Sequence, residues 1–182
     1  MEILKTEIPG LFHIKNFHAT DTRGFFVKTF HKEVFSEAGI SFSLAESFYS
    51  VSHRAVVRGM HFQEPPYAQA KLVCCVSGEI EDVVLDIRVG SPTYGKALGF
   101  RLSGTNYQAL FIPEGLAHGF QSLQDGSITL YYVNQVNVPT CDKGIRYDSF
   151  GYPWPLSPGP ISRRDLQWPP LKDFVSPYFF NS

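Results

Sequence analysis

Residues 58–73 read RGMHFQEPPYAQAKLV and contain two short runs that have the pattern of β-strands. The pair Pro65-Pro66 separates the two runs and predicts a turn between them. In the first run the polar residues occupy alternating positions, as they do on one face of a strand. We therefore expect two adjacent strands that deliver His61 and Lys71 into one pocket.

The chain after Ser41 continues the same pattern of short apolar runs. Glycine, proline and serine turns separate the runs at regular intervals, which is typical of a sandwich or a barrel. A small closed barrel would provide a ligand cavity and remove exposed sheet edges. We expect strands at residues 42–52, 56–63, 70–78, 79–88, 97–104, 108–115, 116–124 and 128–138.

The two ends of the chain carry the expected helices. Residues 31–38, HKEVFSEA, have apolar side chains at helical spacing, and Gly39 follows as a stop signal, which predicts a short helix. Residues 152–170 are rich in proline, so we expect loops that pack over the barrel. A short helical turn is expected at residues 162–166, where Ser162 is a suitable cap. No repeat or linker is visible, so residues 1–182 are expected to form a single all-β domain.

Composition excludes several classes of protein. The chain has 182 residues and a formal net charge of −1, which does not favour a nucleic-acid-binding face. The N-terminus lacks the pattern of a secretory signal, and no apolar run approaches the length of a membrane span. Of three cysteines, Cys74 and Cys75 are neighbours and are expected to be reduced core residues. These features predict a cytoplasmic protein.

Basic and polar residues gather around His61. Arg58 precedes it by three positions, Lys71 lies on the next expected strand, and His118 occurs in a second glycine-bounded turn, EGLAHGF. A lone histidine on a strand is most often a buried residue that is bonded to a backbone carbonyl. Two histidines with a lysine and an arginine instead favour a site for an anionic or carbonyl substrate.

A metal site is the main alternative for these histidines. A metal-binding small barrel commonly has two histidines one residue apart, a carboxylate and a later histidine. Here Gln63 occupies the second position and is a poor ligand, while Glu64 lies outside the pattern. We therefore expect no metal.

The segment ITLYYVN contains Tyr131 and Tyr132, which face opposite sides of the expected strand. The inward tyrosine is either a core residue with a bonded hydroxyl or a proton donor across the cavity from His61. The residue pattern does not decide between these two roles, or between the two tyrosines.

The chain resembles the nucleotide-sugar epimerases typified by dTDP-4-dehydrorhamnose 3,5-epimerase, from about Glu7 to about Leu171. The resemblance rests on several motifs in the right order: DTRGFF, VVRGMHFQ, QAKLV, SGEIEDVVLDIR, SPTYG, IPEGLAHGF and SRRD. It implies a cupin-type (jelly-roll) β-barrel and a homodimer that exchanges N-terminal strands. It also implies a nucleotide-diphosphate ketosugar substrate and neither a metal nor a redox cofactor.

The resemblance also implies roles for individual residues. His61 is the base that removes a proton next to the C4 ketone, Asp165 supports its imidazole, and Tyr131 matches the acid because it precedes Pro139 by eight residues. Lys71 offsets charge on the enolate oxygen, and His118 is a second candidate for this role. Further positions match those that hold the diphosphate or lie near the nucleotide: Arg23, Arg58, Arg164 and Asp142.

Four positions depart from the family pattern. Lys28 stands where most members have glutamate, Glu46 and Phe48 replace a Gln-x-Asn pair, and Asn137 replaces a tyrosine. All of these positions are expected to lie near the nucleotide or the sugar. The proton-transfer residues are kept, so the departures point to altered recognition or to compensated drift around an unchanged substrate.

Several alternatives to a 3,5-epimerase stay open. A single-centre epimerase or a ketoisomerase, using CDP or another nucleotide, would explain the four departures. A sugar-nucleotide-binding module would not need an acid and a base on opposite faces. A metal-dependent cupin dioxygenase would need an iron site, which the ligand pattern does not favour.

Overall fold

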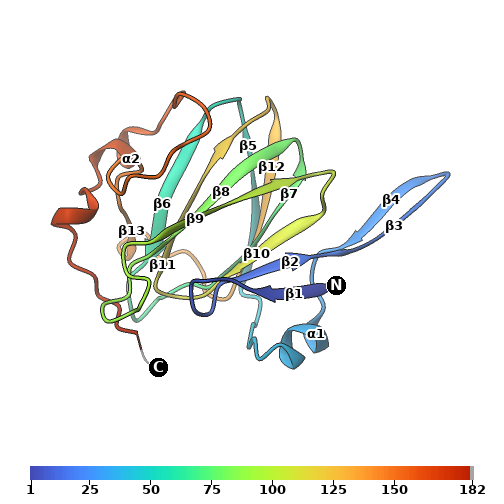
Figure 1. Cartoon of the computed structure of the whole chain (residues 1–182), viewed down its shortest axis with the longest axis horizontal. Coiled ribbons are helices and arrows are strands. Elements are labelled where there is room, and N and C mark those ends of the chain that lie inside the picture. The colour runs from blue at the N-terminus through green and yellow to red at the C-terminus, as the bar shows by residue number, and fades with distance from the viewer. Residues whose placement is uncertain (181–182) are drawn as a thin grey trace.

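Two antiparallel β-sheets face each other in the computed structural model, which describes residues 1–180 (Figure 1). One sheet has six strands in the order β1-β2-β10-β7-β12-β5, and the other has five in the order β13-β6-β11-β8-β9. The strands of the first sheet are β1 (Glu2–Lys5), β2 (Phe12–Lys15), β5 (Glu46–Ser52), β7 (Lys71–Ser77), β10 (Gln108–Ile112) and β12 (Ser127–Val133). Those of the second are β6 (Val57–Gln63), β8 (Glu79–Asp86), β9 (Ala97–Ser103), β11 (Leu116–Ser122) and β13 (Asp142–Gly144). The all-β prediction and all eight expected strands are confirmed.

One detail of the strand prediction was wrong. The strands β6 and β7 are consecutive in the sequence but belong to different sheets, so they are not paired neighbours. The segment with Pro65 and Pro66 carries the chain from one sheet to the other. His61 and Lys71 therefore approach one another across the space between the sheets. The sequence pattern assigned His118 both to a glycine-bounded turn and to the expected strand at residues 116–124, and the structure places it within β11.

Alternation along the strands sorts the buried apolar residues into three layers, one between the two sheets and one on the outer side of each sheet. Val73 and Cys75 of β7 face the other sheet and join the central core, while Leu72 and Cys74 pack on the outer side with Phe35. This strand is buried on both faces, which explains its continuous apolar sequence. Both cysteines are free, as expected, and burial raises the pKa of each thiol to about 12.

The helices lie outside the two sheets. Helix α1 (Lys32–Glu37) places Phe35 against the outer side of the six-stranded sheet and confirms the predicted short helix. Helix α2 (Arg163–Gln167) confirms the predicted C-terminal turn, and the Ser162 hydroxyl accepts a hydrogen bond from the backbone N–H of Asp165 as its cap. A short 3-10 helix, η1 (Leu171–Asp173), follows.

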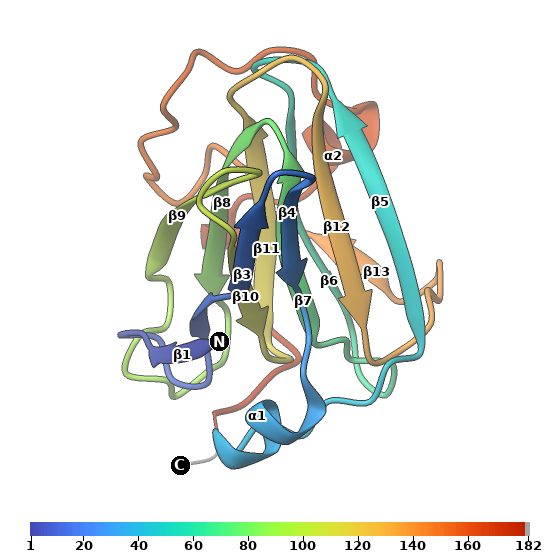
Figure 2. The ribbon, with the colours of Figure 1, turned by 90° about the vertical axis from the view of Figure 1, so that its right-hand side faces the viewer.

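A hairpin of β3 (Phe17–Asp21) and β4 (Gly24–Lys28) projects from the sheets (Figures 1 and 2). Phe17, Phe25 and Phe26 on this hairpin are each at least half exposed. Three large apolar side chains on one projecting element form an unusual surface for a water-facing hairpin.

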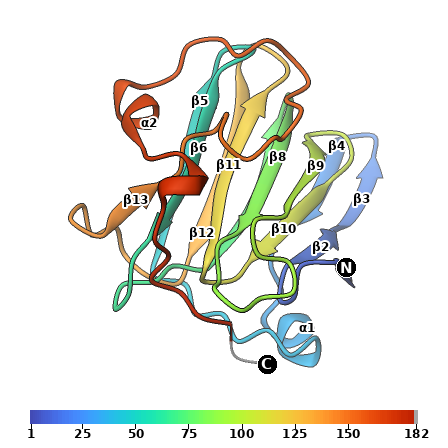
Figure 3. The same ribbon diagram turned by 60° about the vertical axis from the view of Figure 1, so that its left-hand side comes forward.

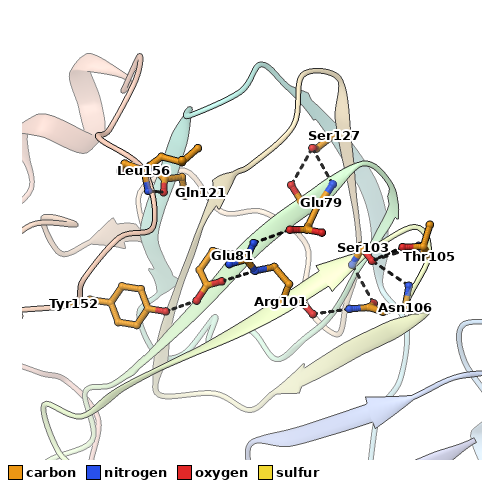
Figure 4. A network of polar contacts seen from close by, with 10 residues as sticks. All are labelled: Glu79, Glu81, Arg101, Ser103, Thr105, Asn106, Gln121, Ser127, Tyr152 and Leu156. Carbon is orange, nitrogen blue, oxygen red and sulfur yellow. Dashed lines mark hydrogen bonds and ion pairs between the residues drawn. The ribbon is translucent and has the colours of Figure 1, made fainter.

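Residues 145–162 cross the outer face of the five-stranded sheet before they reach α2 (Figure 3). Two polar clamps join this segment to the sheet (Figure 4). The Tyr152 hydroxyl donates to Glu81, and the side-chain amide of Gln121 both donates to and accepts from the backbone of Leu156, at 3.0 and 2.9 Å. Gly99 lies directly under the Tyr152 hydroxyl, where any side chain would collide with it. The sheet therefore fixes the path of the segment that leads to Asp165.

No helix within residues 1–180 is long and apolar enough to cross a membrane.

Candidate active site

A cavity of about 660 Å³ opens between the two sheets at the end where inward-facing side chains are polar. A second cavity of about 340 Å³ adjoins it and shares Phe48, His61, Lys71 and Arg164 as lining residues. The larger cavity is also lined by Ser50, Val56, Val57, Arg58, His118, Phe120, Tyr131, Pro160, Ile161, Ser162 and Asp165. The smaller cavity adds Glu46, Phe62, Gln63, Gln69, Asn137 and Asp142.

One close approach between two strands explains the glycines near the histidines. Gly59 of β6 has φ +143°, and a Cβ there would meet the Gly119 Cα of β11 at 2.5 Å. Because both residues lack a side chain, the two strands can come together at this point. The register then pairs His61 directly with His118. The motifs RGMH and AHGF are thus two halves of one local structure.

His61 forms a pair with Asp165. The imidazole Nε2 lies 2.7 Å from Asp165 Oδ1, and the backbone N–H of Gly59 donates to Oδ2 of the same carboxylate at 3.3 Å. Burial alone would raise the pKa of Asp165, but the hydrogen bonds from His61 and Gly59 outweigh it and hold that pKa below its ordinary value. Since Nε2 is directed at a carboxylate, Nδ1 is the nitrogen that can accept a proton.

Lys71 begins β7 and lies deep in the same cavity. Its Nζ donates to the backbone carbonyl of His61 at 3.4 Å. Burial lowers the pKa of Lys71 to about 8, although the negative charges of Asp142 and Asp82 act in the opposite direction. An ammonium group with this pKa is still largely charged near neutral pH and can stabilise a developing negative charge.

A second histidine–carboxylate pair lies in the wall of the larger cavity. His118 Nε2 is 2.8 Å from Asp82 Oδ2, and both side chains are almost completely buried. Asp82 sits on β8, directly beside β11 in the sheet. A buried charge needs such partners to be tolerated. Asp82 therefore fixes the orientation of the His118 imidazole where it lines the cavity.

Tyr131 occupies the wall opposite His61. It is an inward residue of β12, whereas Tyr132 packs on the outer layer with α1, so strand alternation separates the two tyrosines. The Tyr131 ring stacks on the Phe48 ring, with centroids 4.7 Å apart and an interplanar angle of 19°. It also meets the His118 ring edge-on, at a centroid distance of 6.1 Å. Burial, reinforced by the charge of Asp82, raises the pKa of Tyr131, so its hydroxyl keeps its proton.

Two arginines border the cavity. Arg58 Nε donates to the Ser52 hydroxyl at 3.0 Å, and Arg164 bonds to Asp142 and lies 3.3 Å from His61 Nε2. Both side chains remain partly exposed at the opening. Their guanidinium groups therefore offer a planar donor fork to an anionic group bound at the entrance.

Comparison with known proteins agrees with this geometry. Residues 5–173 match the family model described as dTDP-4-dehydrorhamnose 3,5-epimerase. A dTDP-4-dehydrorhamnose 3,5-epimerase from Methanothermobacter thermautotrophicus is 42% identical over 93% of this chain and 94% of the relative. A dTDP-4-dehydrorhamnose 3-epimerase from Streptomyces niveus is 38% identical over 91% of this chain and 81% of the relative.

A solved structure gives the same answer for the fold. The dTDP-6-deoxy-D-glucose-3,5-epimerase from Legionella pneumophila, in complex with dTDP-4-keto-L-rhamnose, superposes with a TM-score of 0.94 at 32% identity, covering 100% of this chain and 99% of that chain. This chain belongs to the dTDP-4-dehydrorhamnose 3,5-epimerase family. It is an isomerase of that type, and its fold is the cupin fold that the sequence motifs implied.

The structure gathers most of the predicted site residues of this epimerase at one end of the sandwich. The proposed proton-transfer set lines the larger cavity: His61, Lys71, Tyr131 and Asp165. The predicted recognition residues that line one or both cavities are Glu46, Phe48, Arg58, His118, Asn137, Asp142 and Arg164. Among them, the Glu46 carboxylate accepts a hydrogen bond from the Asn137 backbone N–H at 2.9 Å.

Two predicted binding residues lie elsewhere in the single chain. Arg23 and Lys28 belong to the projecting hairpin and line neither cavity of the active site. The Arg23 side chain is 89% exposed and bonds to its neighbour Asp21. Within the single chain they are therefore separate from the site.

Asp82, Asp86 and Arg88 alternate along the sequence EDVVLDIR, a pattern that fits either pocket-lining residues or an ordinary strand ion pair and favours a structural role for Arg88. In the structure Asp82 holds His118. Asp86 instead forms an ion pair with Arg88, which confirms the structural role of Arg88. Alternation on β8 puts both carboxylates on the inner face, and only the neighbouring strand decides which one meets a histidine.

Proposed function

We propose that this epimerase inverts C3 and C5 of a dTDP-linked 4-keto-6-deoxyhexose in deoxysugar biosynthesis, by proton abstraction followed by reprotonation on the opposite face. The observation that carries the proposal is the placement of the His61–Asp165 pair and Tyr131 on opposite sheets around one cavity. The complex named for the Legionella pneumophila relative supports the choice of substrate class.

His61 acts as the base in this mechanism. The C4 ketone acidifies the hydrogens on C3 and C5, and the imidazole accepts one of these protons while the C–H electron pair moves into an enolate. Asp165 orients the ring through its 2.7 Å contact and stabilises the imidazolium that forms. Its lowered pKa keeps the carboxylate charged throughout the neutral range.

Lys71 offsets the negative charge on the enolate oxygen. Its ammonium group is desolvated in the cavity, where a charge interaction is much stronger than in water. His118, held by Asp82, is a second group that can face the same oxygen. Neither residue removes a proton from carbon in this proposal.

Tyr131 delivers the proton that inverts the centre. It lies on β12 of the six-stranded sheet, whereas His61 lies on β6 of the facing sheet, so the two groups can approach opposite faces of a sugar between them. The phenol donates a proton to carbon, and the enolate collapses to the ketone. A raised pKa keeps Tyr131 in the protonated form that this step requires.

The remaining predicted residues serve recognition. Arg58 and Arg164 bind the diphosphate at the opening, because guanidinium groups meet phosphate oxygens bidentately. Glu46, Phe48 and Asn137 border the smaller cavity and contact the sugar or the nucleotide. These residues and Lys28 would determine whether the enzyme accepts a CDP- or GDP-linked sugar in place of a dTDP-linked one.

The hairpin suggests a homodimer with shared sites. Its exposed phenylalanines need cover, and β5, the outer strand of the six-stranded sheet, exposes Tyr49 and Val51. If the hairpin of one protomer seats on the other, Arg23 and Lys28 reach the partner's pocket. This exchange would give both residues a role in binding the substrate.

Incubation with dTDP-4-keto-6-deoxyglucose in deuterium oxide, followed by mass measurement, tests the reaction. Two solvent deuterons in the product indicate proton exchange at both centres, and the configuration at C3 and C5 shows which centres are inverted. Inversion of one centre alone is the outcome named for the Streptomyces niveus relative. His61→Ala should abolish exchange, while His53→Ala, a histidine of the exposed surface, should leave it intact. Absence of deuterium with dTDP, CDP and GDP sugars would refute the proposal.

Mixing two inactive variants tests the shared site. Arg23→Ala and His61→Ala each lack a different part of the pocket, and a mixed dimer contains one intact site only if the hairpins are exchanged. Recovery of activity on mixing supports the dimer, and light scattering gives the oligomeric state. A monomer, or a dimer without recovery, would contradict the exchange.

A further inference from the structure

Tyr131 is held differently from the other groups that face the cavity. His61 and His118 are each fixed by a hydrogen bond to a buried carboxylate. The Tyr131 ring is flanked instead by two aromatic rings, Phe48 in parallel and His118 at its edge. His118 is itself fixed by Asp82. Of the two rings that flank Tyr131, Phe48 is therefore the one that a single substitution can remove without disturbing a buried ion pair.

The position of Phe48 on its strand favours a specific role. Phe48 is directly opposite Tyr131 in the β5–β12 register, and the Ser47 hydroxyl beside it donates to the Tyr131 carbonyl at 2.9 Å. Directly opposed residues of an antiparallel pair have the closest side chains. The parallel rings, 4.7 Å apart, therefore limit rotation of the tyrosine about its side-chain bonds.

The chemistry makes this orientation matter. After His61 has taken a proton, the enolate can recover a proton from His61 on the original face or gain one from Tyr131 on the opposite face. Only the second route inverts the centre. A tyrosine displaced by about 1 Å transfers a proton much more slowly, so the original face gains the advantage.

We propose that Phe48 is a positioning residue for Tyr131 and sets the fraction of enolate that is reprotonated with inversion. The inference rests on the proposed roles of His61 and Tyr131. Phe48 also borders both cavities, so a role in substrate contact alone is the competing explanation. The two explanations differ in what happens to enolate that has already formed.

The partition of the enolate can be measured in deuterium oxide as the ratio of inverted product to recovered, uninverted substrate that carries deuterium. The label enters on the original face when the imidazolium of His61, whose side chain is 23% exposed, exchanges the abstracted proton for a solvent deuteron before it returns one to carbon. Phe48→Ala should lower this ratio by about two- to tenfold, the effect expected when one aromatic stack is lost. Phe48→Tyr keeps a ring and should preserve the ratio. Phe48→Leu keeps apolar volume without a ring and should resemble alanine.

Tyr94→Ala is the control, because Tyr94 is an aromatic residue between β8 and β9 that is 44% exposed and lines neither cavity of the active site. A double-mutant cycle sharpens the test: in a Tyr131→Phe background, Phe48→Ala should have no further effect on the ratio. Phe48→Leu serves if the alanine variant does not fold.

The possible failures are distinguishable. If Phe48→Ala raises KM and leaves the ratio unchanged, Phe48 only contacts substrate and the inference is wrong. An effect of Phe48→Ala that persists in the Tyr131→Phe background would overturn it as well. Absence of both exchange and product in the wild-type protein would instead refute the proposed function.

Discussion

Replacing Lys71 by methionine should make the protein more stable and less active at the same time. The Lys71 ammonium is buried at the start of β7, and its pKa falls from 10.5 to about 8. Because about 1.4 kcal/mol corresponds to one pH unit, keeping this group charged costs about 3 kcal/mol near pH 7. Methionine has a similar length and needs no hydration, so the free energy of unfolding should rise by up to that amount.

The sign of the pH dependence follows from the lowered pKa. Between about pH 8 and pH 10.5 the unfolded chain holds a proton on Lys71 that the folded chain has released. The free energy of unfolding of the wild-type protein therefore increases as the pH rises through this window. The advantage of Lys71→Met should shrink by about 2 kcal/mol between about pH 7 and about pH 9.5.

Urea denaturation of both proteins at several pH values measures this difference, with Lys32→Met as a control at an exposed position of α1. Activity provides the second readout. In the wild type, kcat/KM should decline above about pH 8 as the ammonium is lost. The variant should lose about 10²- to 10³-fold in kcat, the usual cost of removing one group that stabilises an oxyanion. A stability difference that does not vary with pH would refute the reasoning.

Three further changes test the support of the site. Asp165→Asn should reduce kcat by about 10³- to 10⁴-fold without loss of fold, since the base loses its charged partner; a loss under tenfold in steady-state assays would contradict the His61–Asp165 pairing. Ser162→Ala removes the cap of α2 and should cost about 1 kcal/mol in urea denaturation, whereas Ser162→Thr, which retains a hydroxyl, should cost much less. Gly99→Ala places a Cβ 1.6 Å from the Tyr152 hydroxyl, so residues 145–162 should become more sensitive to limited proteolysis; Tyr152→Phe, which only loses the bond to Glu81, should show a weaker effect.

Strand alternation was enough to predict much of the site. The rule that alternate residues share a face puts Lys71, Val73 and Cys75 together, and it separates Tyr131 from Tyr132. It does not say which sheet a strand joins. The error over β6 and β7 arose there, because a proline turn is equally compatible with a hairpin and with a crossing between sheets.

Long-range contacts were beyond any local pattern. His61 and Asp165 are 104 positions apart, and their contact depends on the whole path of residues 145–162 over the sheet. Local signals did predict the parts, since Ser162 marked the start of α2. Only the family motifs connected the carboxylate with the base. The direction of the β3–β4 hairpin had no local signal either, because a turn motif specifies the hairpin and not its direction.

The core and the active site follow from one arrangement of inward-facing residues. On β7 and β12 the inward positions hold Lys71 and Tyr131 near the cavity and apolar or small residues farther along. A core-forming residue at position 71 would serve the fold better, since a buried ammonium opposes folding. The lysine is useful only when negative charge develops beside it. The stability lost at Lys71 is therefore the expected counterpart of a preorganised site, and a variant that gains stability there should lose turnover.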